Sequence, residues 1–164
     1  MKRLLQHLIH IPLLAHRAFP AATCEQIRQA VAAGEARHRG EIRFVVEGSW
    51  PPGDVLAGKT TSQRALEVFG LSRVWDTEEN TGVLIYALLC ERQVQVLADR
   101  GINARVPPAT WDVLCQQLLK DYAAGAFESG TVKAITTLSD ILAEHFPATG
   151  ERSNELPDEP LVLN

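Results

Sequence analysis

The hydrophobic pattern between residues 83 and 98 is the most informative one in this chain. Val83 to Cys90 is a continuous uncharged run rich in branched side chains, which predicts a β-strand buried on both faces. After the turn residues Glu91-Arg92, apolar positions alternate over residues 93–98, as in a strand with one buried face. The two runs therefore predict an antiparallel hairpin, whose open end brings the residues before 83 close to those after 98.

The remaining apolar positions predict one further strand and several helices. Alternation over residues 41–47 predicts a half-buried strand. Apolar residues at helical spacing predict helices over residues 19–34, 60–70, 107–122 and 130–146. This order of elements predicts an α/β domain with a small mixed sheet and helices on both faces.

Local residue choices predict where these helices begin. Thr23 followed by Gln26 has the spacing of a capping box, and Thr60 or Thr61 can cap the second helix. Pro107-Pro108 suits the first turn of the third helix, because proline lacks the amide hydrogen that a helix start leaves unpaired.

Length and charge limit the class of protein. A chain of 164 residues fits one domain with a sizeable core, and its net charge of −4 argues against a nucleic-acid partner. Glycine-rich nucleotide-binding motifs are absent, and the widely spaced cysteines lack the pairing of a zinc site. We therefore expect no tightly bound nucleotide and no zinc.

Both ends of the chain differ from its middle. Residues 1–17 form a predicted helical segment, with Leu4, Leu5, Leu8 and Ile9 on one face. Histidines and a proline interrupt the N-terminal apolar run, which is unlike the continuous run of a signal peptide. No apolar run elsewhere approaches the roughly 20 residues that a membrane-spanning helix needs. We expect a cytoplasmic protein without membrane insertion, a monomer or weak dimer, and a disordered acidic tail over residues 148–164.

Oxygen-bearing side chains gather at the open end of the predicted hairpin. This acidic rim comprises Asp76, Glu78, Glu79, Asn80 and Asp99. Calcium takes about six to eight oxygen ligands from flexible loops, and clustered carboxylates favour a cation, so weak Ca²⁺ binding is one hypothesis. The spacing is not that of an EF-hand, and a solvated acidic loop explains the residues equally well.

Arg100, next to Asp99, suggests an alternative chemistry. An arginine at a strand end can bind a phosphate, and a water held by a metal at the acidic rim would make a metal-assisted phosphatase. An ordinary surface ion pair with a glycine turn at Gly101 explains the same residues. Glu41 begins the strand at residues 41–47 and can face the same rim or simply be an edge charge.

The order and spacing of several short motifs resemble the TPM domain family. The matching residues are His38-Arg39-Gly40-Glu41-Ile42-Arg43, Asn80-Thr81-Gly82-Val83-Leu84-Ile85-Tyr86, Ala98-Asp99-Arg100-Gly101-Ile102, Trp111 and Glu144-His145-Phe146-Pro147. The resemblance covers residues 18–147 and implies a three-layer α/β/α sandwich. Thr81 departs from the family pattern, which commonly has Asn before this glycine.

The resemblance leaves two functions open. Some family members are described as acid phosphatases, some bind calcium, and many bacterial members are membrane-anchored without a settled activity. One hypothesis is therefore a non-catalytic interaction domain, tuned by a divalent cation, that assists another protein such as a membrane-anchored homologue. The alternative is a metal-assisted acid phosphatase that acts on phosphoesters.

Overall fold

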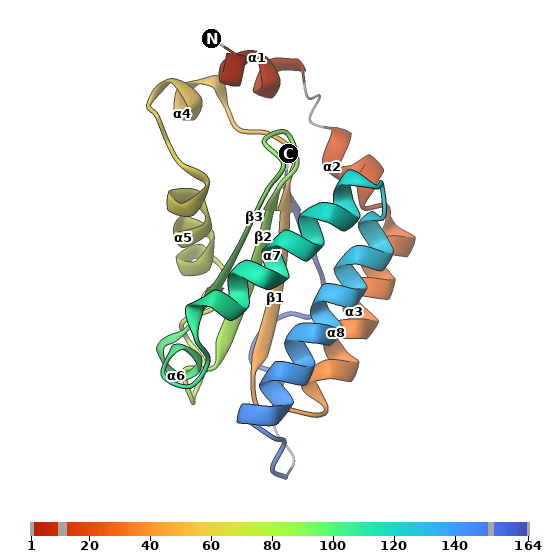
Figure 1. Cartoon of the computed structure of the whole chain (residues 1–164), viewed down its shortest axis with the longest axis vertical. Helices are drawn as coiled ribbons and strands as arrows, with labels where there is room; N and C mark the ends of the chain where they lie inside the picture. Colours follow the sequence, from red (N-terminus) through yellow and green to blue (C-terminus); the bar gives the residue numbers. More distant parts are fainter. Residues whose placement is uncertain (1, 10–12, 151–152, 164) are drawn as a thin grey trace.

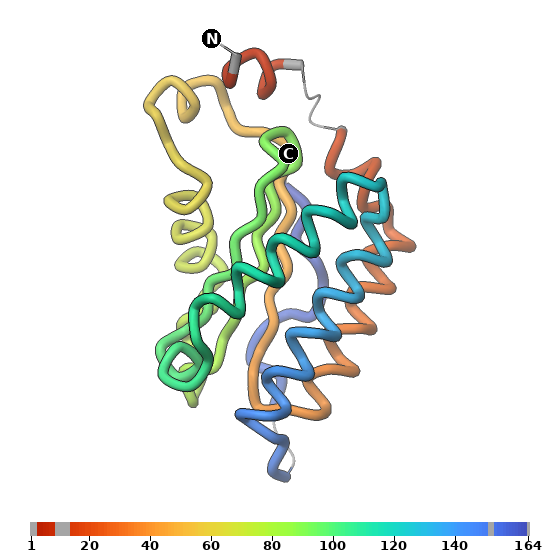
Figure 2. Tube along the Cα trace, viewed as in Figure 1, coloured from red at the N-terminus to blue at the C-terminus, as the bar shows by residue number. Residues whose placement is uncertain are grey.

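The computed structural model describes residues 2–9, 13–150 and 153–163, and its path is traced in Figures 1 and 2. The elements in chain order are α1 Lys2–Ile9, α2 Leu13–Ala18, α3 Ala21–Glu35, β1 Glu41–Glu47, α4 Pro52–Leu56, α5 Thr61–Leu71, β2 Gly82–Leu88, β3 Gln93–Ala98, α6 Arg100–Asn103, α7 Pro108–Ala123, α8 Phe127–His145 and β4 Leu161–Leu163.

The sheet has four strands in the order β3-β2-β1-β4. β2 and β3 pair antiparallel, with Val83 opposite Ala98, so the predicted hairpin is confirmed. β1 pairs parallel with β2, with Glu41 opposite Gly82, and β4 pairs parallel with β1. The sheet is therefore mixed, as predicted, and the open end of the hairpin lies beside the start of β1.

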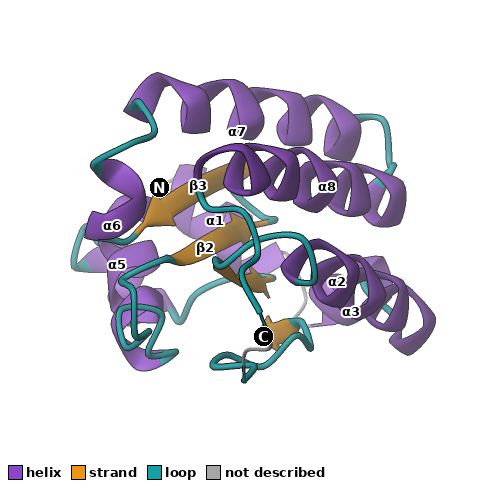
Figure 3. Ribbon diagram, turned by 90° about the horizontal axis from the view of Figure 1, so that it is seen from below, coloured by secondary structure: helices purple, strands orange, loops and turns teal. Residues whose placement is uncertain are grey.

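Helices cover both faces of this sheet, which gives the α/β/α arrangement. α3, α7 and α8 lie on one side and α5 on the other (Figures 1 and 3). All seven residues of β2 are buried. Val83, Ile85 and Ala87 belong to the core under α3, α7 and α8, and Leu84 and Tyr86 belong to the core on the α5 side. An uncharged run without alternation is the expected sequence of such a strand.

Two of the three predicted helix starts are confirmed. Thr60 forms a capping box with Gln63, and α7 begins with Pro108 in its first turn. The capping box at Thr23 was wrong, because α3 begins earlier, after Pro20. Thr23 lies in the first turn and its hydroxyl donates instead to Glu128 Oε2 at 2.6 Å.

The predicted disordered tail is contradicted over residues 153–163. Leu161–Leu163 form β4, and Leu156 is buried in the core on the α5 side. Two charged residues of β1 hold the segment: Glu41 Oε2 accepts from Leu156 N at 3.1 Å, and Arg43 Nη1 donates to the Pro157 and Glu159 carbonyls at 2.9 and 2.6 Å. The segment covers an edge of β1 that would otherwise leave its backbone groups unpaired.

The N-terminal helix forms, and of its predicted apolar face Leu4 packs against the core on the α5 side, but the residue that it buries most fully is His7. Leu5 and Leu8 are more than half exposed, whereas His7 is 4% exposed. His7 Nε2 lies 2.6 Å from Glu91 Oε1, and its Nδ1 accepts from Trp50 N at 2.9 Å. The hydrogen bonds of His7 therefore hold α1 against the rest of the domain. No helix within the described ranges is long and apolar enough to cross a membrane.

Candidate functional site

The hairpin brings two loops of the acidic rim into direct contact. Gly101 N donates to Asn80 O at 3.0 Å, and a Cβ at Gly101 would lie 2.6 Å from that carbonyl oxygen and 2.8 Å from Glu79 O. Only glycine fits this approach. Asn80 has a φ of 56°, a conformation that asparagine tolerates better than most residues. Residues 79–80 and 99–101 therefore form one surface, as the hairpin predicted.

Two acidic side chains of the loop before β2, Asp76 and Glu79, have basic partners. Asp76 forms an ion pair with Arg73, and Glu79 Oε2 lies 2.5 Å from Arg39 Nη1. Arg39 belongs to the connection between α3 and β1, about forty positions away in the sequence. These arginines offset the repulsion that the sequence alone suggested between neighbouring carboxylates.

Two other rim residues contact groups outside the first loop. The backbone amide of Glu78 donates to Glu155 Oε2 of the C-terminal segment at 2.8 Å. Asn80 Oδ1 accepts from Arg100 Nε at 2.9 Å. The rim is thus linked both to the C-terminal segment and to the start of α6.

Asp99 is the rim residue with a buried carboxylate oxygen that makes no hydrogen bond. Its Oδ1 caps α6 by accepting from Arg100 N at 2.7 Å. Its Oδ2 is buried and has no hydrogen-bond partner. A buried carboxylate oxygen without a partner is costly, and a cation or a water molecule is the ordinary way to satisfy it.

The structure does not assemble the five predicted residues as one ligand set. Within residues 2–9, 13–150 and 153–163, no group of three or more His, Cys, Asp or Glu side chains has the spacing to hold a metal ion. Glu79, Asn80 and Asp99 meet through their loops, whereas Asp76 and Glu78 have the separate partners described above. Calcium binding therefore stays a prediction.

Thr81, the departure from the family pattern, has a structural role. It is 1% exposed, and its hydroxyl donates to Arg39 O at 2.8 Å. Its amide donates to Thr77 Oγ1 at 2.9 Å. The hydroxyl thus fixes the loop that carries Arg39, and with it the partner of Glu79.

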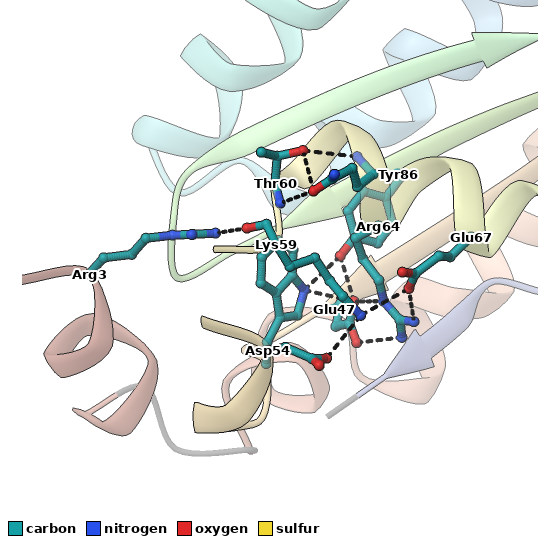
Figure 4. Close-up of polar contacts among 10 residues, drawn as sticks. Arg3, Glu47, Asp54, Lys59, Thr60, Arg64, Glu67 and Tyr86 are labelled. Atoms are coloured by element: carbon teal, nitrogen blue, oxygen red, sulfur yellow. Dashed lines mark hydrogen bonds and ion pairs between the residues drawn. The ribbon is translucent and has the colours of Figure 1, made fainter. Parts of the chain in front are cut away.

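A second polar centre, at the opposite end of β1, was missed by the sequence analysis (Figure 4). Glu47 is 3% exposed, and its two carboxylate oxygens accept from Arg64 Nη2 and Nε at 2.9 and 3.0 Å. Oε2 also accepts from Tyr86 OH at 2.5 Å and Trp50 Nε1 at 3.1 Å. Burial and the Glu47 carboxylate raise the pKa of the Tyr86 phenol.

This centre is fully paired, which favours a structural role. Arg64 also contacts Glu67, which in turn binds Lys59, and Lys59 binds Asp54 (Figure 4). The only indication in the sequence was a charged residue at the end of a strand next to apolar ones. Because a buried carboxylate needs several donors, its partners had to come from other elements.

Comparisons with known proteins agree with this architecture. The family model of the TPM domain matches residues 16–141. The NMR structure of the BA42 protein from the psychrophilic bacterium Bizionia argentinensis is 27% identical, with a TM-score of 0.76, and the match covers 87% of this chain and 93% of that one. The N-terminal domain of a P. gingivalis protein is 16% identical with a TM-score of 0.66, covering 91% and 94%, and shows the fold alone. The comparison with curated proteins gave no match.

Proposed function

Because this chain belongs to the TPM domain family, we propose that it is a non-catalytic accessory domain that assists another protein and binds a divalent cation weakly at its acidic rim. The observation that carries the cation is the buried Oδ2 of Asp99, which has no partner. It lies two residues from Gly101, which packs on the carbonyl oxygens of Glu79 and Asn80. Carboxylate, carboxamide and carbonyl oxygens are the ligands that calcium prefers.

The arginine partners explain why this binding is weak. A cation that uses Glu79 must compete with Arg39 for its carboxylate, and even an exposed ion pair is worth up to about 1 kcal/mol. The displacement is therefore affordable but lowers the net affinity. We expect dissociation constants of ~10⁻⁴–10⁻³ M for Ca²⁺. Mg²⁺ binds less well, because it requires stricter octahedral geometry.

The same arginines support an accessory role over a catalytic one. The carboxylates of Glu79 and Asp76 are already engaged in ion pairs with Arg39 and Arg73, which leaves neither of them open to a substrate. Paired side chains on a rim of this kind suit contact with another protein, in which charge pairs determine orientation and specificity. The partner class we favour is a membrane-anchored homologue with the same fold.

One observation favours the alternative, a metal-assisted phosphatase. Arg100 is exposed, and of its guanidinium nitrogens only Nε has a hydrogen-bond partner among the described residues. The other nitrogens can bind phosphate oxygens next to a cation held by Asp99.

A calcium titration followed by amide NMR tests the proposal. Ca²⁺ should shift the resonances of residues 78–82 and 99–101, and Ca²⁺ at ten times its Kd should stabilise the fold by about 1.4 kcal/mol. Asp99→Asn should remove both effects and leave the fold intact, because asparagine caps helices as well as aspartate does. Asp112→Asn, an exposed substitution on α7, is the matched control. Calcium-induced shifts that persist unchanged in Asp99→Asn would place the cation elsewhere.

A phosphoester assay on the same samples separates the two functions. Phosphate release that requires metal and disappears in Arg100→Gln would establish the phosphatase. Calcium binding without phosphate release supports the accessory domain.

A further inference from the structure

The outward face of α1 is apolar, which is the reverse of an ordinary surface helix. His7 is the most fully buried side chain of α1, whereas Leu5 and Leu8 are 55% and 59% exposed. These two leucines are three positions apart and therefore lie on one side of the helix. A surface helix normally turns its leucines to the core, so leucines that face outward mark a contact surface. We propose that this end of the molecule binds the surface of an anionic lipid bilayer.

Polar contacts on the inner side of α1 fix this orientation. Arg3 Nε donates to Glu91 Oε1 at 2.6 Å, and Arg3 Nη2 donates to Lys59 O at 2.6 Å. The Arg3 guanidinium also lies over the Trp50 ring, 5.3 Å from its centroid. These contacts add to the hydrogen bonds of His7 described above. A rotation of α1 that buried the two leucines would break all of them, so the leucines stay outside.

A third exposed leucine lies on the neighbouring helix. α4 contacts α1, and the two helices lie side by side at one extremity of the molecule (Figure 1). Leu56 of α4 is 73% exposed. A protruding end with outward leucines suits a flat surface, and amphipathic helices sink about 5–10 Å into the interfacial region of a bilayer. No helix of the described residues is long and apolar enough to span a membrane, so the contact we propose is peripheral.

The charge at this end of the molecule complements an anionic surface. Residues 1–24 contain three Lys or Arg and no Asp or Glu, although the whole chain has 20 acidic and 16 basic residues. Arg17 of α2 and Arg92 of the hairpin turn are exposed, and their side chains have no hydrogen-bond or ion-pair partner among the described residues. Leu14 of α2 and Arg92 line the same cavity, which places α2 beside the turn. Unpaired arginines at a surface bind anionic headgroups.

The acidic rim lies at the other end of the hairpin. β2 runs from Gly82, next to the rim, to Leu88, next to the turn. Repulsion between the rim carboxylates and anionic headgroups therefore favours one orientation, in which α1 faces the bilayer and the rim faces away from it.

Cosedimentation of the full chain with vesicles tests this proposal. In EDTA, which prevents a calcium bridge at the rim, the protein should bind vesicles of equimolar phosphatidylglycerol and phosphatidylcholine but not vesicles of phosphatidylcholine alone. Leu5→Ser combined with Leu8→Ser should reduce the partition coefficient at least about tenfold, because both leucines are lost from the interface. Leu66→Ser combined with Leu71→Ser, at positions of α5 that are 65% and 77% exposed, is the matched control and should leave binding unchanged.

A second pair of substitutions tests the charge. Arg17→Gln and Arg92→Gln should each weaken binding to the anionic vesicles about fivefold at low salt, and the binding of the wild type should fall as salt rises. Equal binding to neutral vesicles, or no binding to anionic vesicles at low salt, would overturn the proposal even if the serine substitutions loosened α1. A dimer that the serine substitutions abolish, without lipid binding, would assign the leucines to a second copy and overturn it as well. Because EDTA is present, none of these results bears on calcium binding at the rim.

Discussion

Replacing Glu35 by Gln should change how stability depends on pH. The pKa of Glu35 is raised to about 9 in the fold, chiefly by burial, from an ordinary value of 4.5. Between these values the folded protein holds a proton that the unfolded chain releases. A raised pKa therefore contributes stability that is fully present below pH 4.5 and is lost as pH rises towards 9, at about 1.4 kcal/mol per pH unit.

Glutamine keeps the neutral contacts and removes this titration. Its carbonyl oxygen can accept from Ile42 N, as Glu35 Oε1 does, and its amide can donate to Asp158. Between pH 5.5 and pH 7.5 the wild type should lose about 3 kcal/mol relative to Glu35→Gln, or roughly 6–12 °C in Tm for a chain of this size. The sign follows from burial, because deprotonation places a charge among other carboxylates.

Urea unfolding at several pH values measures this difference directly. Glu25→Gln, on the exposed side of the same helix, is the matched control, because the pKa of Glu25 is lowered to about 2 by hydrogen bonds from Arg28 and Gln29. It should leave the dependence between pH 5 and pH 8 unchanged. If wild type and Glu35→Gln lose stability in parallel, Glu35 is ionised in the fold and the reasoning fails.

Three other substitutions test the core, a close helix–helix contact and the buried histidine. Ile85→Asp, at a position with 0% exposure in the core under α3, α7 and α8, should cost several kcal/mol in chemical unfolding, and unchanged melting would remove this strand from the core. Gly34→Ala places a Cβ 2.1 Å from Ser139 Oγ and should cost about 1–3 kcal/mol, whereas Gly53→Ala meets nothing within 4 Å and should be neutral. His38→Gln should reduce the loss of folding stability that the wild type shows as pH falls below 6.5. The pKa of His38 is lowered to about 4, so the wild type loses up to about 3 kcal/mol as pH falls from 6.5 to 4, and an equal loss in His38→Gln would refute this.

Much of the fold was predictable from local patterns. The run from Val83 to Cys90 predicted the central strand, because a strand that is apolar at every position must be covered on both faces. The turn at Glu91-Arg92 predicted its antiparallel partner and therefore the contact between Asn80 and Gly101. These features depend on neighbours in sequence, whose spacing fixes the geometry.

The acidic rim was predictable only in part. The hairpin placed Asn80 and Asp99 together, but no pattern in the sequence indicated that Arg39 would pair with Glu79 or Arg73 with Asp76. Charged side chains are long, and an exposed ion pair is worth too little to leave a recognisable local pattern. Their pairing therefore follows from where the backbone places them.

The tertiary structure alone decided how the two ends of the chain pack on the domain. The polar segment 153–163 lacked the composition of an ordered element, yet its carbonyls are bound by Arg43 and its Leu156 fills the core. The side chain of His7 is the buried one of α1, because Glu91 and the Trp50 amide are its hydrogen-bond partners there. By itself the sequence determined the longer helices and strands β1 to β3, since that information is local and periodic, whereas β4 has no such pattern. The partners of buried polar groups were decided by the fold, since each must satisfy its hydrogen bonds with whatever distant groups the packing brings near.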